Sequence, residues 1–251
     1  MRSITFRVPH ILFMPKYPRM RIPSIIKKYL MAITGAILTV FVLAHMAGNL
    51  QIFLGPNAIN EYAHKLQHLP YGLLWVNRIF LLAATAVHVW MAILLTAENR
   101  IARPQGAHLT KSVQATLSSK TMGLSGSIIL IFIVFHILHF TVRSIYPVFQ
   151  TDAFYTTLNG EQIYNVYKMM VDGFSVTWVS LFYIIAMGLL CMHLCHGVSS
   201  MFQSLGLRNK KWRPRLHVFA HIYAWVVFLG FIAIPVAVLI TKYTSINLLP
   251  L

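Results

Sequence analysis

The chain has 251 residues, of which 57% are hydrophobic and only 10% are charged. A soluble domain usually carries about 25% charged residues, so this composition excludes an ordinary soluble surface and predicts several membrane spans. The formal charge of +16 would suit nucleic-acid binding, but no groove-reading motif accompanies it, so we do not expect that function.

Five apolar segments follow one another along the chain, and each is long enough to cross a bilayer as a helix. They cover residues 29–54, 73–97, 122–145, 176–202 and 218–240. We therefore expect an all-α integral membrane protein, with a five-helix transmembrane unit over residues 29–245. A basic segment, residues 1–28, precedes this unit, and a short tail, residues 246–251, follows it. The polar connection 145–175 fits either a short amphipathic interfacial helix or a loop.

The basic residues gather on one side of these predicted spans. Sixteen of the 21 Lys and Arg residues precede the first span or lie in the second-to-third and fourth-to-fifth connections. Four of the five acidic residues lie on the other side: Glu61, Asp152, Glu161 and Asp172. Because basic loops stay on the cytoplasmic side, this asymmetry predicts an inside N-terminus and an outside C-terminus.

Four consecutive apolar segments carry histidine well inside their predicted spans. Ionisable groups are costly in a bilayer, and one in each of four helices indicates a shared function rather than isolated hydrogen bonds. The histidines are His45, His88, His136, His139, His193 and His196.

The depths of these histidines form two levels. His45 and His136 lie about 24–26 Å along their helices from the inner boundary, whereas His88 and His193 lie about 15 and 20 Å from it. Two pairs at two levels are what two stacked haems need if each iron is held by two imidazoles. The sequence therefore predicts a helix bundle that encloses two haems.

Three other kinds of site fit the sequence less well. A zinc or copper site needs three or four ligands at one depth, and a proton relay needs carboxylates inside the spans. Covalent haem needs a Cys-x-x-Cys-His motif, which is absent. Cys191 and Cys195 lie four residues apart in an apolar segment, and we interpret them as packing residues. Non-covalent b-type haem remains.

Arg143 follows His136 by seven residues, which would place it on nearly the same helix face, about 10 Å further out. It fits either the partner of a haem propionate or an interfacial arginine whose charge reaches the membrane surface. Glycines lie inside the spans, including Gly35 and Gly126. They would either leave space for the haem macrocycle or let the helices pack closely.

Four segments carry a resemblance to a known family. They are A-H-M-A-G-N-L in the first span, A-V-H-V-W in the second, V-F-H-I-L-H-F-T in the third, and M-H-L-C-H-G-V-S-S-M-F-Q-S-L-G in the fourth. With the number and order of spans, residues 25–240 resemble the cytochrome b subunit of succinate:quinone oxidoreductases. The form in question has five helices and two haems, and occurs in bacterial succinate dehydrogenases and related fumarate reductases.

The resemblance implies which histidines bind iron. In the fourth span it aligns His193, Gly197 and Gly206 with the family pattern, which selects His193 over His196. In the third span it selects His136 over His139. The family pairs its first span with its third and its second with its fourth. His45 and His136 would then hold the outer haem, and His88 and His193 the inner haem.

The resemblance further implies a role as membrane anchor and electron carrier in a bacterial cytoplasmic membrane. Two haem b groups would carry electrons between an iron–sulfur subunit and a membrane quinone, by family habit menaquinone. A separate flavoprotein subunit would perform the succinate or fumarate chemistry, since this chain has no dinucleotide fingerprint for FAD. Both soluble subunits would dock on the basic cytoplasmic face. Candidates for exchanging protons with quinone are Glu61, His64 and His68 in the outer loop, and His217 and His221 on the inner side.

Two other functions stay open. One is a di-haem cytochrome b that anchors another quinone-linked oxidoreductase, such as a formate dehydrogenase or a hydrogenase. The other is a transporter or structural anchor without haem.

Overall fold

The computed structural model describes residues 22–101 and 121–250, so most of the basic segment 1–28 lies outside the described residues. Its five long helices are α1 (Ser24–Asn49), α3 (Leu73–Ile101), α5 (Met122–His136), α7 (Thr177–Ser204) and α8 (Arg213–Tyr243). The short segments η1 (Leu50–Leu54) and η3 (Ile137–Thr141) extend α1 and α5. With these extensions, all five are long and apolar enough to cross a membrane, so residues 22–101 and 121–250 hold the number of spans that the sequence predicts.

Large apolar side chains cover much of the outside of the bundle. Each long helix exposes at least one aliphatic residue over more than half of its surface, for example Val40, Leu82, Ile131, Ile185 and Leu229. A soluble protein rarely leaves so much apolar surface open, whereas lipid covers it in a membrane protein.

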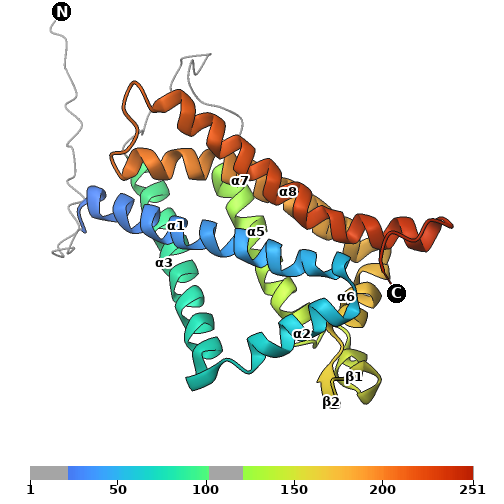
Figure 1. Cartoon of the computed structure of the whole chain (residues 1–251). Helices are drawn as coiled ribbons and strands as arrows, with labels where there is room; N and C mark the ends of the chain where they lie inside the picture. The colour runs from blue at the N-terminus through green and yellow to red at the C-terminus, as the bar shows by residue number, and fades with distance from the viewer. Residues whose placement is uncertain (1–21, 102–120, 251) are drawn as a thin grey trace, which may run out of the picture.

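The helices pack through small residues, and an ion pair with a buried lysine joins two of them. α7 and α8 run side by side along much of their length (Figure 1), and Ala220 and Ala224 of α8 are completely buried. Cys191 and Cys195 are buried in the same cluster, as expected of packing residues. Small side chains let membrane helices approach closely. At the other edge of the bundle, the ammonium of Lys27 in α1 pairs with Glu98 in α3.

Shorter elements gather at one end of the bundle, and we call residues 55–72 and 146–176 the cap. The cap contains α2 (Pro56–Gln67), η2 (Pro70–Gly72), η4 (Pro147–Gln150), η5 (Asp152–Phe154), β1 (Tyr155–Leu158), β2 (Glu161–Tyr164) and α6 (Val166–Ser175) (Figure 1). Asn60 joins α2 to α6, because its amide donates to Asn165 Oδ1 at 3.2 Å and accepts from the Tyr167 N–H at 2.9 Å.

The cap departs from the all-α prediction. β1 and β2 form an antiparallel hairpin closed by Asn159 and Gly160, whose φ values are 52° and 83°. Two positive φ values define the tight turn that asparagine and glycine favour between paired strands. The connection 145–175 therefore contains a short helix, Val166–Ser175, as one of the two predictions has it, together with a hairpin that neither predicts.

The end of the third span is irregular. After His136 the helix widens into the π-helical turn Ile137–Thr141, and Arg143 then adopts a φ of 63°. A π-helical turn is rare and is found frequently at functional sites. The span therefore ends at Thr141, short of the predicted boundary at 145.

Candidate functional site

His45 and His136 come together between α1 and α5. Their ring centroids are 5.8 Å apart and their planes are almost perpendicular, at 84°. His136 is the last residue of α5, just before the π-helical turn. The structure therefore brings these two rings together, and their binding of one iron stays a prediction.

His88 and His193 lie at a second level, where each faces a glycine of a neighbouring helix. A Cβ placed on Gly35 of α1 would lie 3.4 Å from His88 Cε1, and one on Gly126 of α5 would lie 3.4 Å from His193 Cε1. Each glycine precedes the outer-level histidine of its own helix by ten residues, so the two levels are about 15 Å apart. His88 and His193 also lie within range of electrostatic interaction with each other.

Each of these two histidines has a hydroxyl beside its Nδ1 nitrogen. Thr34 Oγ1 is 3.3 Å from His88 Nδ1, and Ser125 Oγ is 3.3 Å from His193 Nδ1. Both hydroxyls also contact backbone carbonyls of their own helices, at 2.7 and 3.2 Å. A hydroxyl that donates to such a carbonyl can accept from an imidazole N–H, which would leave Nε2 with the lone pair that binds iron.

The outer pair uses different partners. His136 Nδ1 lies 3.3 Å from the hydroxyl of Tyr183, and His139 Nδ1 lies 3.1 Å from the same oxygen. His45 differs from the other three, because its Nε2 is 3.2 Å from the Asn49 amide nitrogen. Iron binding through that nitrogen would replace the contact with Asn49.

The two neighbouring histidines have other surroundings. His139 is completely buried, and its ring packs against Phe140 with centroids 3.9 Å apart. His196 lies within electrostatic range of Arg208, toward the α7–α8 connection. Among residues 22–101 and 121–250, no cluster of three or more His, Cys, Asp or Glu side chains is placed to hold a metal ion. Haem binding by His45, His88, His136 and His193 stays a prediction.

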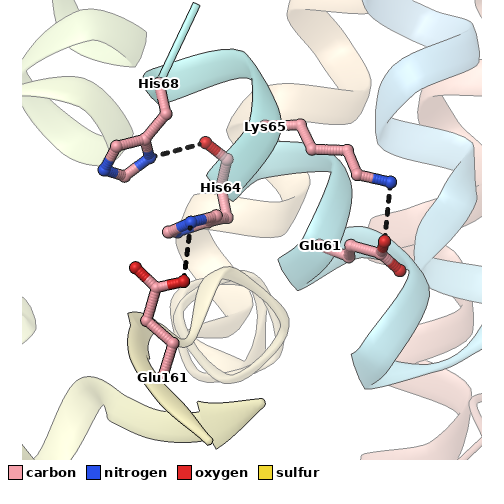
Figure 2. Close-up of polar contacts among 5 residues, drawn as sticks. All are labelled: Glu61, His64, Lys65, His68 and Glu161. Carbon is pink, nitrogen blue, oxygen red and sulfur yellow. Dashed lines mark hydrogen bonds and ion pairs between the residues drawn. The ribbon is translucent and has the colours of Figure 1, made fainter. Parts of the chain in front are cut away.

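The outer quinone candidates lie in the connection between the first two spans, and this connection forms the helix α2. Figure 2 shows Glu61, His64 and His68 at α2 and its end, with Glu61 paired to Lys65 at 2.6 Å. The hydrogen bond and positive charge of that lysine lower the pKa of the Glu61 carboxyl. His64 Nε2 is 3.4 Å from a carboxylate oxygen of Glu161, and His68 Nδ1 is 2.9 Å from the His64 carbonyl oxygen.

A small polar pocket of about 170 Å³ lies between α2 and the hairpin. His64, His68 and Arg143 line it, whereas Glu61 does not. The Arg143 guanidinium lies 4.4 Å from the ring centroid of Tyr164. Because the helix has already ended, Arg143 does not continue the face of His136, and that prediction was wrong. Its contact with a haem propionate stays a prediction.

The inner candidates lie on the first turns of α8. His221 Nδ1 is 2.9 Å from the His217 carbonyl oxygen, and the two rings are 4.3 Å apart. His217 also lines a cavity of about 330 Å³ together with Arg208 and Arg213. This end of the bundle therefore places a titratable ring among positive charges.

Three polar residues of the site escaped the sequence reasoning: Thr34, Ser125 and Tyr183. A signal for two of them is present, because a hydroxyl residue followed by glycine precedes histidine at the same distance in α1 and in α5. Nothing in the sequence near Tyr183 marks it, since its partners lie 44 and 47 residues away. Comparison of the chain with protein families, curated proteins and solved structures finds no match.

Proposed function

We propose that the chain is the membrane-anchoring cytochrome b subunit of a succinate:quinone oxidoreductase, with two b-type haems held by His45 and His136 and by His88 and His193. The observation that carries the haem proposal is the arrangement shared by His88 and His193. Each has its Nδ1 3.3 Å from a hydroxyl that can donate to a backbone carbonyl, so an N–H donated from Nδ1 to that hydroxyl would leave Nε2 to bind iron.

When bound, haem supplies a reversible one-electron carrier, and the protein supplies its position and its dry surroundings. The two proposed positions lie about 15 Å apart along the bundle, by the spacing of the residues in α1 and α5. One position lies near the cap, and the other lies nearer the end that carries Arg208 and Arg213. Electrons would pass between these ends through the membrane interior.

The succinate and partner parts of the proposal rest on the resemblance in the four histidine-bearing segments. The positively charged end suits docking of an iron–sulfur subunit, which in turn binds a flavoprotein, on the cytoplasmic side. Menaquinone would react at the cap, where His64, His68 and Arg143 line the polar pocket.

An absorption spectrum of the purified protein tests the haem proposal. We expect two b-type haems per chain, released by acid acetone because they are not covalently bound. Absence of a reduced b-type α-band would reject the proposal. Gentle purification tests the partners: a flavoprotein and an iron–sulfur protein should accompany the chain, whereas a molybdenum or nickel enzyme would favour the alternative cytochrome.

Single histidine replacements test the pairing. His45→Ala and His136→Ala should each remove or convert the same haem, and His88→Ala and His193→Ala should each affect the other one, because axial ligation dominates the state of the iron. His196→Ala should retain two low-spin haems. Redox-titrated spectra distinguish the two haems, and loss of one haem in both His45→Ala and His88→Ala would contradict the two-level arrangement.

A further inference from the structure

Tyr183 lies between two histidines inside the bundle. Its hydroxyl is 3.3 Å from His136 Nδ1 and 3.1 Å from His139 Nδ1. The rings of Phe132 and Phe174 pack edge-on against the tyrosine ring, with centroids 4.9 and 5.0 Å away. The tyrosine is 6% exposed, so its polar partners must come from the protein.

The number of protons available restricts how the hydrogen bonds among His136, Tyr183 and His139 can run. A tyrosine hydroxyl has one proton to donate, so it donates to one histidine and accepts from the other. If His136 offers Nε2 to iron, its Nδ1 carries the proton and donates to Tyr183. Tyr183 then donates to His139, whose own proton must lie on Nε2.

The chain of hydrogen bonds ends at His139. His139 is completely buried, and its Nε2 has no hydrogen-bond partner among residues 22–101 and 121–250. A Cβ on Gly173 would lie 3.2 Å from that nitrogen and 2.9 Å from the ring of Phe140, so only glycine leaves the imidazole room. The π-helical turn Ile137–Thr141 contains His139, which is thereby held beside the same hydroxyl as His136.

We propose that Tyr183 is a positioning residue for the outer haem: its hydroxyl, held by His139, accepts from His136 Nδ1 and keeps Nε2 directed at the iron. This inference rests on the proposed function, because it assumes that His136 is an iron ligand. It extends to the outer level the arrangement that Thr34 and Ser125 provide at the inner level. It also gives His139 a role that does not involve binding iron.

The test is Tyr183→Phe in the intact, haem-loaded complex. Loss of an outer partner of a metal-binding histidine typically weakens metal binding by about 10- to 100-fold, so we expect outer-haem occupancy to fall when haem is limiting. The midpoint potential of the outer haem should rise, because His136 becomes a weaker electron donor, and its low-spin electron paramagnetic resonance signal should shift. The inner haem should keep its potential and its signal.

Tyr223→Phe is the matched control. Tyr223 is another tyrosine inside a span, but its hydroxyl donates to the Thr39 carbonyl at 2.6 Å. It should leave both haems unchanged. A normal outer-haem potential and signal in Tyr183→Phe would overturn the inference, as would an equal shift in Tyr223→Phe. Absence of haem from the unmodified complex would instead reject the proposed function itself, so the two failures are distinguishable.

A second pair of variants tests the same inference if the Tyr183→Phe protein cannot be obtained. His139→Asn places an amide oxygen where Nδ1 accepts, whereas His139→Leu provides no acceptor. The asparagine variant should stay close to the unmodified protein, and the leucine variant should shift the outer haem in the same direction as Tyr183→Phe. Identical outer-haem potentials in the two variants would contradict a role for His139 in holding the hydroxyl.

Discussion

Replacement of Gly126 by valine gives a graded test of the inner histidine level. A Cβ at this position lies 3.4 Å from His193 Cε1, which is already a tight contact, and the valine methyls extend about 1.5 Å beyond it. Overpacking of this kind costs about 1–3 kcal/mol, which corresponds to about 5- to 150-fold in an equilibrium constant. Gly126→Ala, which adds the Cβ alone, should have a much smaller effect.

The same helix offers a matched control. A Cβ on Gly123 would meet nothing within 4 Å, so Gly123→Val changes helix propensity in the same direction without approaching His193. The assay is the haem-to-protein ratio of the purified protein together with redox-resolved spectra. Gly126→Val should lower the occupancy of the inner haem or shift its spectrum, and Gly123→Val should not.

The equivalent change on α1 extends the test. Gly35 stands opposite His88 at the same distance of 3.4 Å, so Gly35→Val should affect the same haem as Gly126→Val. The outer haem should retain its spectrum in both variants. The contact between Gly126 and His193 would be refuted as the cause by either of two results. One is a larger change in the outer haem than in the inner haem in Gly126→Val. The other is a change in the inner haem in Gly123→Val as large as that in Gly126→Val.

Three further predictions concern the rest of the molecule. Glu98→Gln should lower the melting temperature more than Lys27→Met, because Lys27 is 4% exposed and would keep a buried charge without its partner; equal melting temperatures would contradict this. Burial raises the pKa of the Asp172 carboxyl, so its charge costs stability as the pH rises above 3.8; Asp172→Asn should therefore unfold at a higher temperature than the unmodified protein at pH 7 and at the same temperature near pH 3. The basic asymmetry predicts an outside C-terminus, and a C-terminal reporter that is active only in the cytoplasm would refute it.

The five spans could be predicted because a bilayer demands about 20 apolar residues, and apolar runs of that length are plain in the sequence. The levels of the histidines could be inferred because residue number converts directly to height in a continuous helix. The same conversion failed at Arg143, where the π-helical turn and a positive φ interrupt the helix. Residues 137–141 contain no sequence pattern that predicts the interruption, because the interruption lies where the span meets the cap.

The sequence carries two local signals of the structure of the cap. Asn159-Gly160 between short segments rich in tyrosine, threonine and isoleucine is typical of a hairpin, and the structure has one there. Gly55-Pro56 marks the start of α2, because proline is favoured in the first turn of a helix. In contrast, the hydrogen bonds of Tyr183 depend on how α7 packs against α5, which no local pattern in one sequence reveals.

The repeated spacing in α1 and α5 has a consequence for assembly. Each of these helices carries one histidine of the outer level. Ten residues earlier, it carries the glycine that faces a histidine of the inner level. A helix is stiff along its axis, so sliding either helix by one residue would displace both levels by the same 1.5 Å or so. Once the first of the two proposed haems had fixed the heights of α1 and α5, the glycines facing the histidines of the second would already be aligned. Insertion of the second haem would then need less ordering of the chain than insertion of the first, and loading would be cooperative.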